Sequence, residues 1–355
     1  MVRCGIIGTG IIARAHAEGI EKTPDATLSA ICDVKPEAMD VFLSDMQIEK
    51  TSVACFTDYK ELILSKKVDA IYICTPTKSH CEIACFATKH HLFVFCEKPI
   101  AMNEKEAERM VKSIEETQVV GMVGFAFRYI PAVDYIKSLI NEGKLGKIRH
   151  FKGYFYANRL ADEAHELEWR HLKEIAGSGV VGDLICHVAD LSQYLLGWKN
   201  EELQNLHAQS DIVVPTRRNP STGKPDEVTA EDRAVVYATT KDKVQLLFEG
   251  SRYFPFEMGF QIAGNKGALK YNMMHYNEVE TIFYEKEGSY SQKYSMVYER
   301  HTIPKAFQCE SDVEGRFIRE SMAFIEAVKG KRKIENDFEA GLKNQKLLDD
   351  IVKSF

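Results

Sequence analysis

Several features that define particular classes of protein are missing from this sequence. No apolar run approaches the length of a membrane-spanning helix, and the apolar start has only the length of a strand, so we expect neither a membrane span nor a signal peptide. The longest basic run is 329–333 and the net charge is −6, which argues against a nucleic-acid surface. The nine cysteines show no disulfide-like spacing, which favours a reducing, cytoplasmic location.

A metal centre is not indicated either. Cys81 and Cys85 are spaced to lie on one face of a helix and could share a metal ion, but no second pair of ligands accompanies them. Two small hydrophobic side chains packed in a core are the simpler interpretation.

Length and composition indicate a globular protein with two domains. The chain has 355 residues, of which 45% are hydrophobic and 28% charged, and this length exceeds one ordinary core. We expect a first domain over residues 1–125 and a second over 126–355, with the closing helices able to pack back on the first.

The stretch from Val2 to Asp33 carries the most specific pattern. A strand-length apolar run leads into Gly8-x-Gly10-x-x-Ala13, a helix follows, and a second strand ends on Asp33. Gly8 permits a tight turn, Gly10 lets the backbone approach a pyrophosphate, and Ala13 lets the helix pack closely on the strand. The helix N-terminus offers free N–H groups to phosphates. The sequence therefore predicts a dinucleotide site formed by Gly8, Thr9, Gly10, Ile11 and Ile12.

Asp33 predicts which dinucleotide binds. Its carboxylate can accept hydrogen bonds from the adenosine ribose hydroxyls and would repel a 2′-phosphate. No arginine follows it to bind such a phosphate. We therefore expect NAD rather than NADP as the cofactor.

The order of the expected elements gives the fold class. Strands alternate with helices through residue 125, which predicts an α/β domain with a doubly wound parallel sheet, the Rossmann arrangement. Later segments alternate apolar and polar residues, which predicts an α+β domain with a large, mainly antiparallel open sheet. A helix is expected over Asp183 to Leu196, and a long, mobile loop over Pro215 to Thr229.

One candidate for catalysis follows a strand of the first domain. In Glu97-Lys98-Pro99 the lysine comes at the sheet edge where ligands of such folds bind. Its ammonium could stabilise an alkoxide, with Pro99 fixing the backbone. The alternative is an exposed lysine that precedes a helix.

Two further candidates lie in the second domain. A glycine-rich turn from Gly177 opens a helix on which Asp183 and His187, four residues apart, share one face. A histidine suits proton exchange with a hydroxyl, and the carboxylate would orient it or bind the substrate. A capping aspartate beside a core histidine is the simpler reading of this segment alone. Trp169-Arg170 could close over a cofactor or sugar, although surface packing explains this pair almost as well.

Together these features resemble the Gfo/Idh/MocA oxidoreductase family, which includes glucose–fructose oxidoreductase and inositol dehydrogenase. The resemblance implies a Rossmann domain and a C-terminal domain whose open sheet often makes subunit contacts, and hence a homo-oligomer. The similar segments follow the family's order over most of the chain: Gly8-x-Gly10-x-x-Ala13, Thr75-Pro76 with His80, Glu97-Lys98-Pro99, Arg128-Tyr129-x-Pro131, Gly143-Lys144-Leu145-Gly146, Trp169-Arg170, Gly177-x-Gly179, Asp183-x-x-x-His187 and Gly264-Asn265-Lys266-Gly267.

The resemblance also implies roles for individual residues. Cys186 departs from it, since relatives commonly carry a small residue such as serine or glycine there. The implied catalytic group is Lys98, Asp183 and His187. Implied cofactor contacts are Thr75, Pro76, His80, Glu97, Lys98, Trp169 and Arg170. Substrate contacts are expected from Arg128, Tyr156 and His165 together with the catalytic group.

These inferences predict an NAD-dependent dehydrogenase that oxidises a secondary hydroxyl of a sugar, cyclic polyol or glycoside. His187 would take the proton, Lys98 would stabilise the alkoxide in place of a metal, and Asp183 would bind substrate or position the base. The resemblance alone favours a ring hydroxyl of a glucoside or inositol, for example with a 3-keto product. Two alternatives remain: a sugar oxidoreductase that never releases NAD, and a nucleotide-sensing regulator, against which the intact catalytic group counts.

Overall fold

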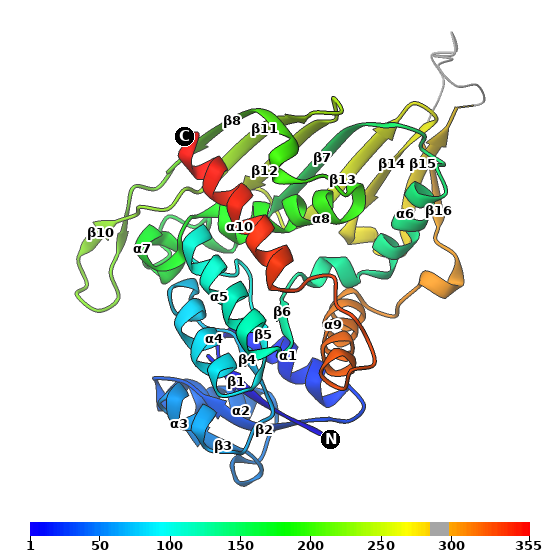
Figure 1. The fold of residues 1–355 in the computed structure, drawn as a ribbon. Helices are drawn as coiled ribbons and strands as arrows, with labels where there is room; N and C mark the ends of the chain where they lie inside the picture. Colours follow the sequence, from blue (N-terminus) through cyan, green and yellow to red (C-terminus); the bar gives the residue numbers. More distant parts are fainter. Residues whose placement is uncertain (285–297) are drawn as a thin grey trace. The chain divides into compact units, whose positions relative to one another are not determined.

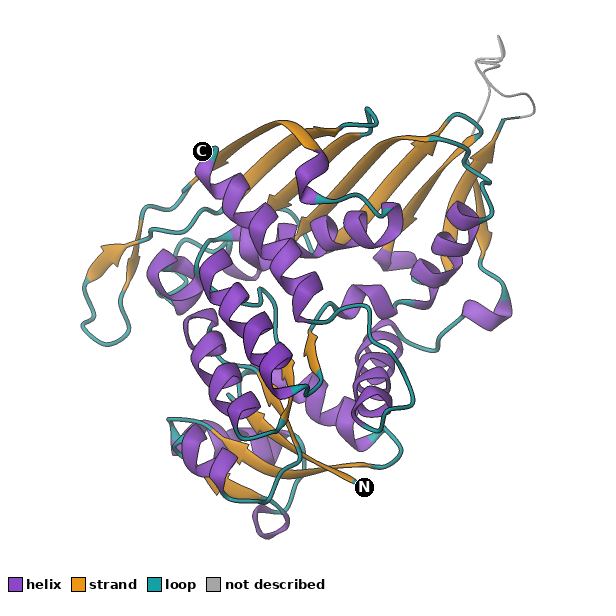
Figure 2. Cartoon of the chain, viewed as in Figure 1, coloured by secondary structure: helices purple, strands orange, loops and turns teal. Residues whose placement is uncertain are grey.

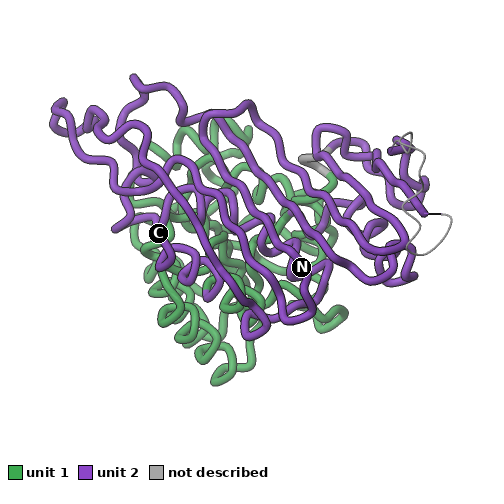
Figure 3. Tube along the Cα trace, turned by 90° about the horizontal axis from the view of Figure 1, so that it is seen from above, with its two compact units in different colours: residues 1–126, 313–345 green, residues 127–312, 346–355 purple. Residues whose placement is uncertain are grey.

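The structure is a computed structural model that describes residues 1–284 and 298–355. The chain divides into two compact units (Figure 3). Unit 1 contains residues 1–126 and 313–345, and unit 2 contains residues 127–312 and 346–355. The chain therefore passes between the units after residues 126, 312 and 345.

A six-stranded parallel sheet forms the centre of unit 1. Its strands are β1 (Val2–Ile7), β2 (Ala26–Cys32), β3 (Ala54–Phe56), β4 (Ala70–Ile73), β5 (Phe93–Cys96) and β6 (Gly121–Val123). They lie in the order β3-β2-β1-β4-β5-β6, and every pair is parallel (Figure 1). This order is that of the doubly wound dinucleotide-binding fold, which reverses direction between β1 and β4. The predicted Rossmann class is confirmed.

Polar residues cap the starts of two helices in unit 1. The Asp58 side chain accepts a hydrogen bond from the Lys60 amide, and the Asn103 side chain accepts one from the Glu106 amide. Such caps satisfy amide groups that have no partner inside the helix. The helices are α1 (Ile11–Glu21), α2 (Pro36–Asp45), α3 (Tyr59–Leu64), α4 (His80–Lys89), α5 (Glu104–Thr117), α9 (Asp312–Val328) after its first residue, and α10 (Phe338–Lys353) as far as residue 345.

Unit 2 is built on an eight-stranded sheet in the order β16-β15-β14-β13-β7-β12-β11-β8. Within the described part of this sheet only the β7–β12 pair is parallel, so the predicted mainly antiparallel sheet is confirmed. No sequence pattern predicted the edge strand β16. The strands are β7 (Ile148–Tyr156), β8 (Leu203–Asp211), β11 (Arg233–Thr240), β12 (Gln245–Ser251), β13 (Glu257–Gly264), β14 (Gly267–Asn272), β15 (Glu278–Phe283) and β16 (Glu299–Thr302).

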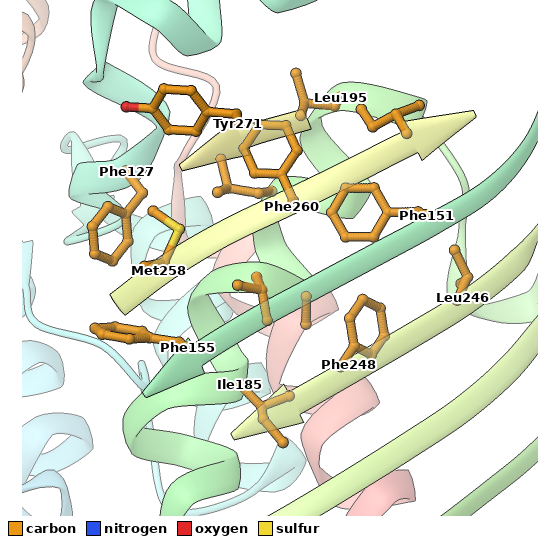
Figure 4. Close-up of a cluster of buried hydrophobic side chains, with 14 of the residues drawn as sticks. Phe127, Phe151, Phe155, Ile185, Leu195, Leu246, Phe248, Met258, Phe260 and Tyr271 are labelled. Carbon is orange, nitrogen blue, oxygen red and sulfur yellow. The ribbon is translucent and has the colours of Figure 1, made fainter. Parts of the chain in front are cut away.

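Helices cover one face of this sheet (Figures 1 and 2). They are α6 (Pro131–Asn141), α8 (Cys186–Leu196) and the end of α10 from residue 346. Phe151, Phe248 and Phe260 project from neighbouring strands into the core, together with Ile185 (Figure 4). Each of these phenylalanines is fully buried, so truncation to alanine should cost about 3–5 kcal/mol. This core is the rigid platform under α8.

The expected mobile loop at Pro215 to Thr229 is instead partly a hairpin, formed by β9 (Thr216–Arg218) and β10 (Pro225–Glu227). Arg217 lies buried between exposed neighbours. Its guanidinium donates to the carbonyls of Leu160, Asp162 and His165 at 2.9, 2.6 and 3.0 Å. A buried cation requires such acceptors, and the polar composition of the segment did not reveal them.

The helix predicted over Asp183 to Leu196 also differs from expectation. Val181–Ile185 forms a π-helical turn, and α8 begins at Cys186. Single π turns inside helices are frequent at functional sites. The segment 173–196 has the length and mean hydropathy of a membrane span, contrary to expectation, but 78% of its most apolar stretch is buried in the core.

Shorter helical pieces connect these elements. They are α7 (Lys173–Ala176) and the 3-10 turns η1 (Lys50–Ser52), η2 (Thr77–Ser79), η3 (Ala126–Tyr129), η4 (Asn158–Leu160), η5 (Trp169–His171), η7 (Asn200–Glu202), η8 (Met273–His275) and η9 (Lys305–Phe307).

Candidate active site

The two glycines of the β1–α1 turn serve different purposes. Gly8 has φ +90°, and a Cβ there would lie 2.7 Å from the carbonyl oxygen of Cys74. Gly10 has φ −71° and ψ −168°, which any residue can adopt, and a Cβ there would meet nothing within 4 Å. Open space therefore lies beside Gly10 at the N-terminus of α1, where Ile11 is 73% exposed. This space and the free helix N-terminus fit a dinucleotide pyrophosphate.

Asp33 is fixed against the glycine turn. One carboxylate oxygen accepts from the Thr9 amide at 2.9 Å and from the Thr9 hydroxyl at 3.0 Å, and the other accepts from the Lys35 amide at 3.0 Å. Val34 beside it is 82% exposed. The carboxylate is thus held beside the glycine turn, which brings the predicted residues of β1, α1 and β2 together, and its contact with a dinucleotide ribose stays a prediction.

The segment after β4 is braced to the segment after β5. One nitrogen of the buried His80 ring lies 3.0 Å from the Pro99 carbonyl oxygen, and the other lies 2.9 Å from the Thr75 carbonyl oxygen. Burial lowers the pKa of His80, although these carbonyls act in the opposite direction. Thr75 and Pro76 thus reach the same edge of the sheet as Lys98, and a contact between His80 and the cofactor stays a prediction.

Glu97 anchors the backbone of Lys98 from within the core. Its carboxylate accepts from the Lys98 amide at 3.1 Å, and its other oxygen lies 2.6 Å from Nε2 of His16. Burial opposes ionisation of Glu97, but the hydrogen bond and charge of His16 outweigh it, and the pKa is lowered. The Lys98–Pro99 peptide is cis. No motif in the sequence connects His16 with Glu97, so this contact was not predicted.

Asp183, in unit 2, lies between two guanidinium groups. Its carboxylate is 3.7 Å from Nε of Arg170 and 3.9 Å from Nη2 of Arg252. Arg252 is 2% exposed and also pairs with the buried Asp232 at 3.5 Å. Flanking positive charges favour the ionised form of a carboxyl group. Asp183 is therefore equipped to accept hydrogen bonds from hydroxyl groups.

His187 follows in the first turn of α8 and is 8% exposed. Its ring packs edge-on against Phe127, with centroids 4.5 Å apart, and at a tilt against Phe155, at 5.7 Å. These contacts fix the imidazole plane, as a proton acceptor requires. Cys186 beside it is fully buried in the core.

Glu231, which no sequence motif marks, shapes the turn that carries Asp183. One carboxylate oxygen accepts from the amides of Gly179 and Val181 at 2.7 and 3.1 Å. A Cβ at Gly179 would lie 1.9 Å from the Glu231 carbonyl oxygen, so only glycine fits there. The glycine-rich turn was a visible signal, but its partner lies 52 residues away in sequence.

Charged residues cluster around Glu168, which lies three residues after His165, an expected substrate contact. Glu168 lies 2.7 Å from Arg159, 3.5 Å from Arg170 and 3.6 Å from His165. Burial opposes ionisation of Glu168, but the hydrogen bonds and charge of Arg159 lower its pKa to about 2. The guanidinium of Arg170 lies 4.2 Å from the ring centroid of Trp169. Arg170 thus joins this cluster to Asp183.

Arg128 and Tyr156, expected to contact substrate, have other contacts in the structure. Arg128 donates to both oxygens of the buried Asp190 at 2.8 and 2.5 Å. Tyr156 stacks on Tyr154, and strand alternation places it on the face opposite to Phe155, which packs against His187. The structure therefore does not bring Tyr156 together with His187, and the substrate roles of both residues stay predictions.

The residues of unit 1 fit NAD, which would supply a hydride acceptor when bound. The open space at Gly10, the N-terminus of α1 and Asp33 would hold its pyrophosphate and ribose. Among the described residues, no three histidine, cysteine or acidic side chains are grouped to hold a metal ion.

Two family models match almost the whole chain. Residues 2–125 match the oxidoreductase family with an NAD-binding Rossmann fold, and residues 137–355 match its C-terminal alpha/beta domain. Solved structures agree: that of levoglucosan dehydrogenase with NADH and levoglucosan is 25% identical, with a TM-score of 0.87 over 99% of this chain and 96% of that chain.

Curated relatives cover different shares of the chain. Levoglucosan dehydrogenase of Pseudarthrobacter phenanthrenivorans is 31% identical over 62% of this chain, and the match spans just over half (56%) of that relative's length. Glucose-6-phosphate 3-dehydrogenase of Bacillus subtilis is 30% identical over 77% of this chain and 75% of the relative. Myo-inositol 2-dehydrogenase of Thermotoga maritima is 27% identical over 82% and 81%.

Proposed function

Because this chain belongs to the Gfo/Idh/MocA family of NAD-binding oxidoreductases, we propose that it oxidises a secondary ring hydroxyl of a sugar, cyclic polyol or glycoside to a ketone. The arrangement of unit 2 supports this proposal. The carboxylate of Asp183 lies between Arg170 and Arg252. One helical turn later, two phenylalanine rings fix the imidazole of His187. A hydrogen-bond acceptor beside a proton acceptor suits a substrate that is rich in hydroxyl groups.

The proposed roles follow from the chemistry of each side chain. His187 takes the hydroxyl proton as general base, and Asp183 accepts hydrogen bonds from the hydroxyls of the substrate. Lys98 places a positive charge beside the oxygen that becomes an alkoxide. The backbone of Lys98 is held by Glu97, so its charge is positioned before the reaction starts.

The preferred substrate class is a glucoside or an inositol, with a 3-keto sugar as one product. The names of three relatives support it: a levoglucosan, a glucose-6-phosphate 3- and a myo-inositol 2-dehydrogenase. The charged cluster of Glu168 with Arg159, in the segment 154–170, is expected to form one wall of the substrate site.

The first experiment screens sugars, polyols and glycosides for NADH absorbance, and titrates NAD and NADP. Asp33 predicts tighter binding of NAD, and equal or tighter binding of NADP would show that Asp33 does not meet the ribose. Purified protein that carries bound NAD would favour the alternative of a sugar oxidoreductase that never releases NAD. Absence of hydride transfer with every substrate would move the assignment to a nucleotide-sensing regulator.

Lys98→Met tests the mechanism. It keeps much of the side-chain length and removes the charge. The activation barrier of hydride transfer should therefore rise by several kcal/mol, the range found for preorganised electrostatic groups. Binding of NAD should change far less, because the phosphates meet the turn at Gly10. Stopped-flow hydride transfer and NAD titration on the same variant decide the matter, and an unchanged rate removes Lys98 from the mechanism.

We also propose that the protein is a cytoplasmic homo-oligomer that associates through the open face of the unit 2 sheet. Val235 and Tyr237 alternate with buried residues of β11 and are 47% and 36% exposed. Apolar side chains exposed on a sheet face suit subunit contact. Sedimentation of the wild type and of Tyr237→Lys tests this, and a monomeric wild type contradicts it.

A further inference from the structure

A buried histidine joins the helix of the glycine turn to the residue before Lys98. His16 lies in the second turn of α1 and is 0% exposed, and Glu97 directly follows β5 and is 7% exposed. His16 Nε2 and Glu97 Oε1 are 2.6 Å apart. Two elements that are 81 residues apart in sequence are thus tied by one short hydrogen bond.

The surroundings of His16 determine which of its nitrogens carries a proton. Its ring contacts Tyr72, Phe95 and Phe317, with centroid distances of 4.8 to 5.6 Å. Nδ1 is buried and has no hydrogen-bond partner among the described residues. A ring protonated on Nδ1 alone would leave that N–H group unsatisfied, at a cost of about 1–3 kcal/mol, and would offer Glu97 no donor. A proton on Nε2 has its acceptor in Glu97.

The Glu97 carboxylate is held on several sides. Oε1 accepts from His16, and Oε2 accepts from the Lys98 amide at 3.1 Å. A Cβ on Gly124 would lie 3.0 Å from Oε1, so the backbone after β6 closes over the carboxylate. Because His16 and Lys98 both favour the charged form, the pKa of Glu97 stays below its ordinary value despite burial. An ionised, immobile carboxylate fixes the amide of Lys98 and attracts its ammonium.

We propose that His16 is a positioning residue for Lys98: its Nε2–H group donates to Glu97, and this bond holds the carboxylate that sets the Lys98 backbone. This inference rests on the function proposed for Lys98. Packing alone would not need an ionisable pair here, because an apolar aromatic residue would fill the same space without burying a charge.

Two substitutions separate positioning from packing, because each keeps what the other loses. His16→Gln retains an amide N–H donor that can reach Glu97 but removes the ring. His16→Phe retains a ring among Tyr72, Phe95 and Phe317 but removes the donor. Positioning predicts that His16→Phe lowers kcat for hydride transfer by about 10- to 100-fold, the range found when a partner that orients a metal ligand is lost.

His16→Gln should stay within about fivefold of the wild-type kcat. The reverse order, with the phenylalanine variant active and the glutamine variant impaired, overturns the proposal. In both variants the Kd for NAD should stay within about threefold of the wild type, because the Gly10 turn is unchanged. A loss of NAD affinity as large as the loss of kcat would show general damage to unit 1 and would also overturn it. His90→Phe, at the exposed C-terminal end of α4 in unit 1, is the matched control and should behave as wild type.

A second measurement needs no substrate. In protein with ¹⁵N-labelled histidine, the signal lost in His16→Gln should come from a ring that is protonated at Nε2. A ring protonated at Nδ1 alone would overturn the inference. If the wild type oxidises none of the sugars, the proposed function fails, and the tautomer still decides whether His16 donates to Glu97.

Discussion

The two glycines of the β1–α1 turn should fail in different ways when each is replaced by alanine. At Gly8 the new Cβ would lie 2.7 Å from a backbone oxygen, and the φ of +90° is one that side chains rarely adopt. The left-handed backbone alone costs about 1–2 kcal/mol. Relief of the clash requires the end of β4 to move, so we expect a total loss of about 2–4 kcal/mol in the free energy of unfolding.

At Gly10 neither penalty applies. The backbone is extended and a Cβ meets nothing within 4 Å, so the only cost is that of alanine as a helix N-cap, at most about 1 kcal/mol. If the pyrophosphate lies in the open space, the methyl group obstructs it, and NAD affinity should fall about 10- to 100-fold, or about 1.4–2.7 kcal/mol.

Denaturant unfolding and calorimetric NAD titration on both variants form the assay. The expected pattern is an unstable Gly8→Ala and a stable Gly10→Ala that binds NAD weakly. Normal NAD binding by Gly10→Ala would refute the placement of the pyrophosphate. Normal stability of Gly8→Ala would refute the steric argument.

Three further predictions concern unit 2. His187→Ala should lower turnover by about 10²–10⁴-fold while NAD still binds, measured by steady-state kinetics and titration, and a folded variant with normal turnover would exclude this base. Arg217→Met should raise the KM for sugar at least about tenfold with unchanged Kd for NAD, since three loop carbonyls lose their donor. Arg233→Met changes an exposed residue and is the control, in which the KM for sugar should stay unchanged. Burial and the charges of Arg252 and Arg217 lower the pKa of His171 from 6.5 to about 4. Between about pH 4 and pH 6.5, therefore, His171 is protonated in the unfolded chain and neutral in the folded chain. Unfolding free energy should therefore fall by up to about 3 kcal/mol as the pH drops from about 6.5 to about 4, and His171→Gln should lose that component in urea titrations.

Local sequence patterns were sufficient where one short segment builds the feature. The β1–α1 turn and Asp33 lie within one strand–helix–strand unit, so residue spacing and glycine chemistry predicted them. The parallel sheet followed from alternation of strands and helices, and the antiparallel sheet followed from alternation of apolar and polar residues.

Features that depend on distant residues were not predictable. Glu231 reaches the turn of Asp183 from 52 residues away, and no periodicity marks a residue whose partner is a pair of backbone amides. Glu231 also binds the amide of Val181, the first residue of the π turn at Val181–Ile185, where the helix rule gave the wrong geometry. The burial of Arg217 was not predictable from its polar segment, because its hydrogen-bond acceptors are backbone carbonyls of another loop.

The division of the chain has a consequence for the order of synthesis. Three phenylalanines that complete the core of unit 1 come from residues 313–345: Phe317 packs on His16, Phe324 on Tyr72 and Phe95, and Phe338 beside Gly121. The ribosome must add residues 127–312 before any of them exists, which takes roughly 10–40 s at 5–20 residues per second. During that interval the first 126 residues display apolar surface that only later residues can cover, so a chaperone that binds such surface would meet this chain while it is still being made.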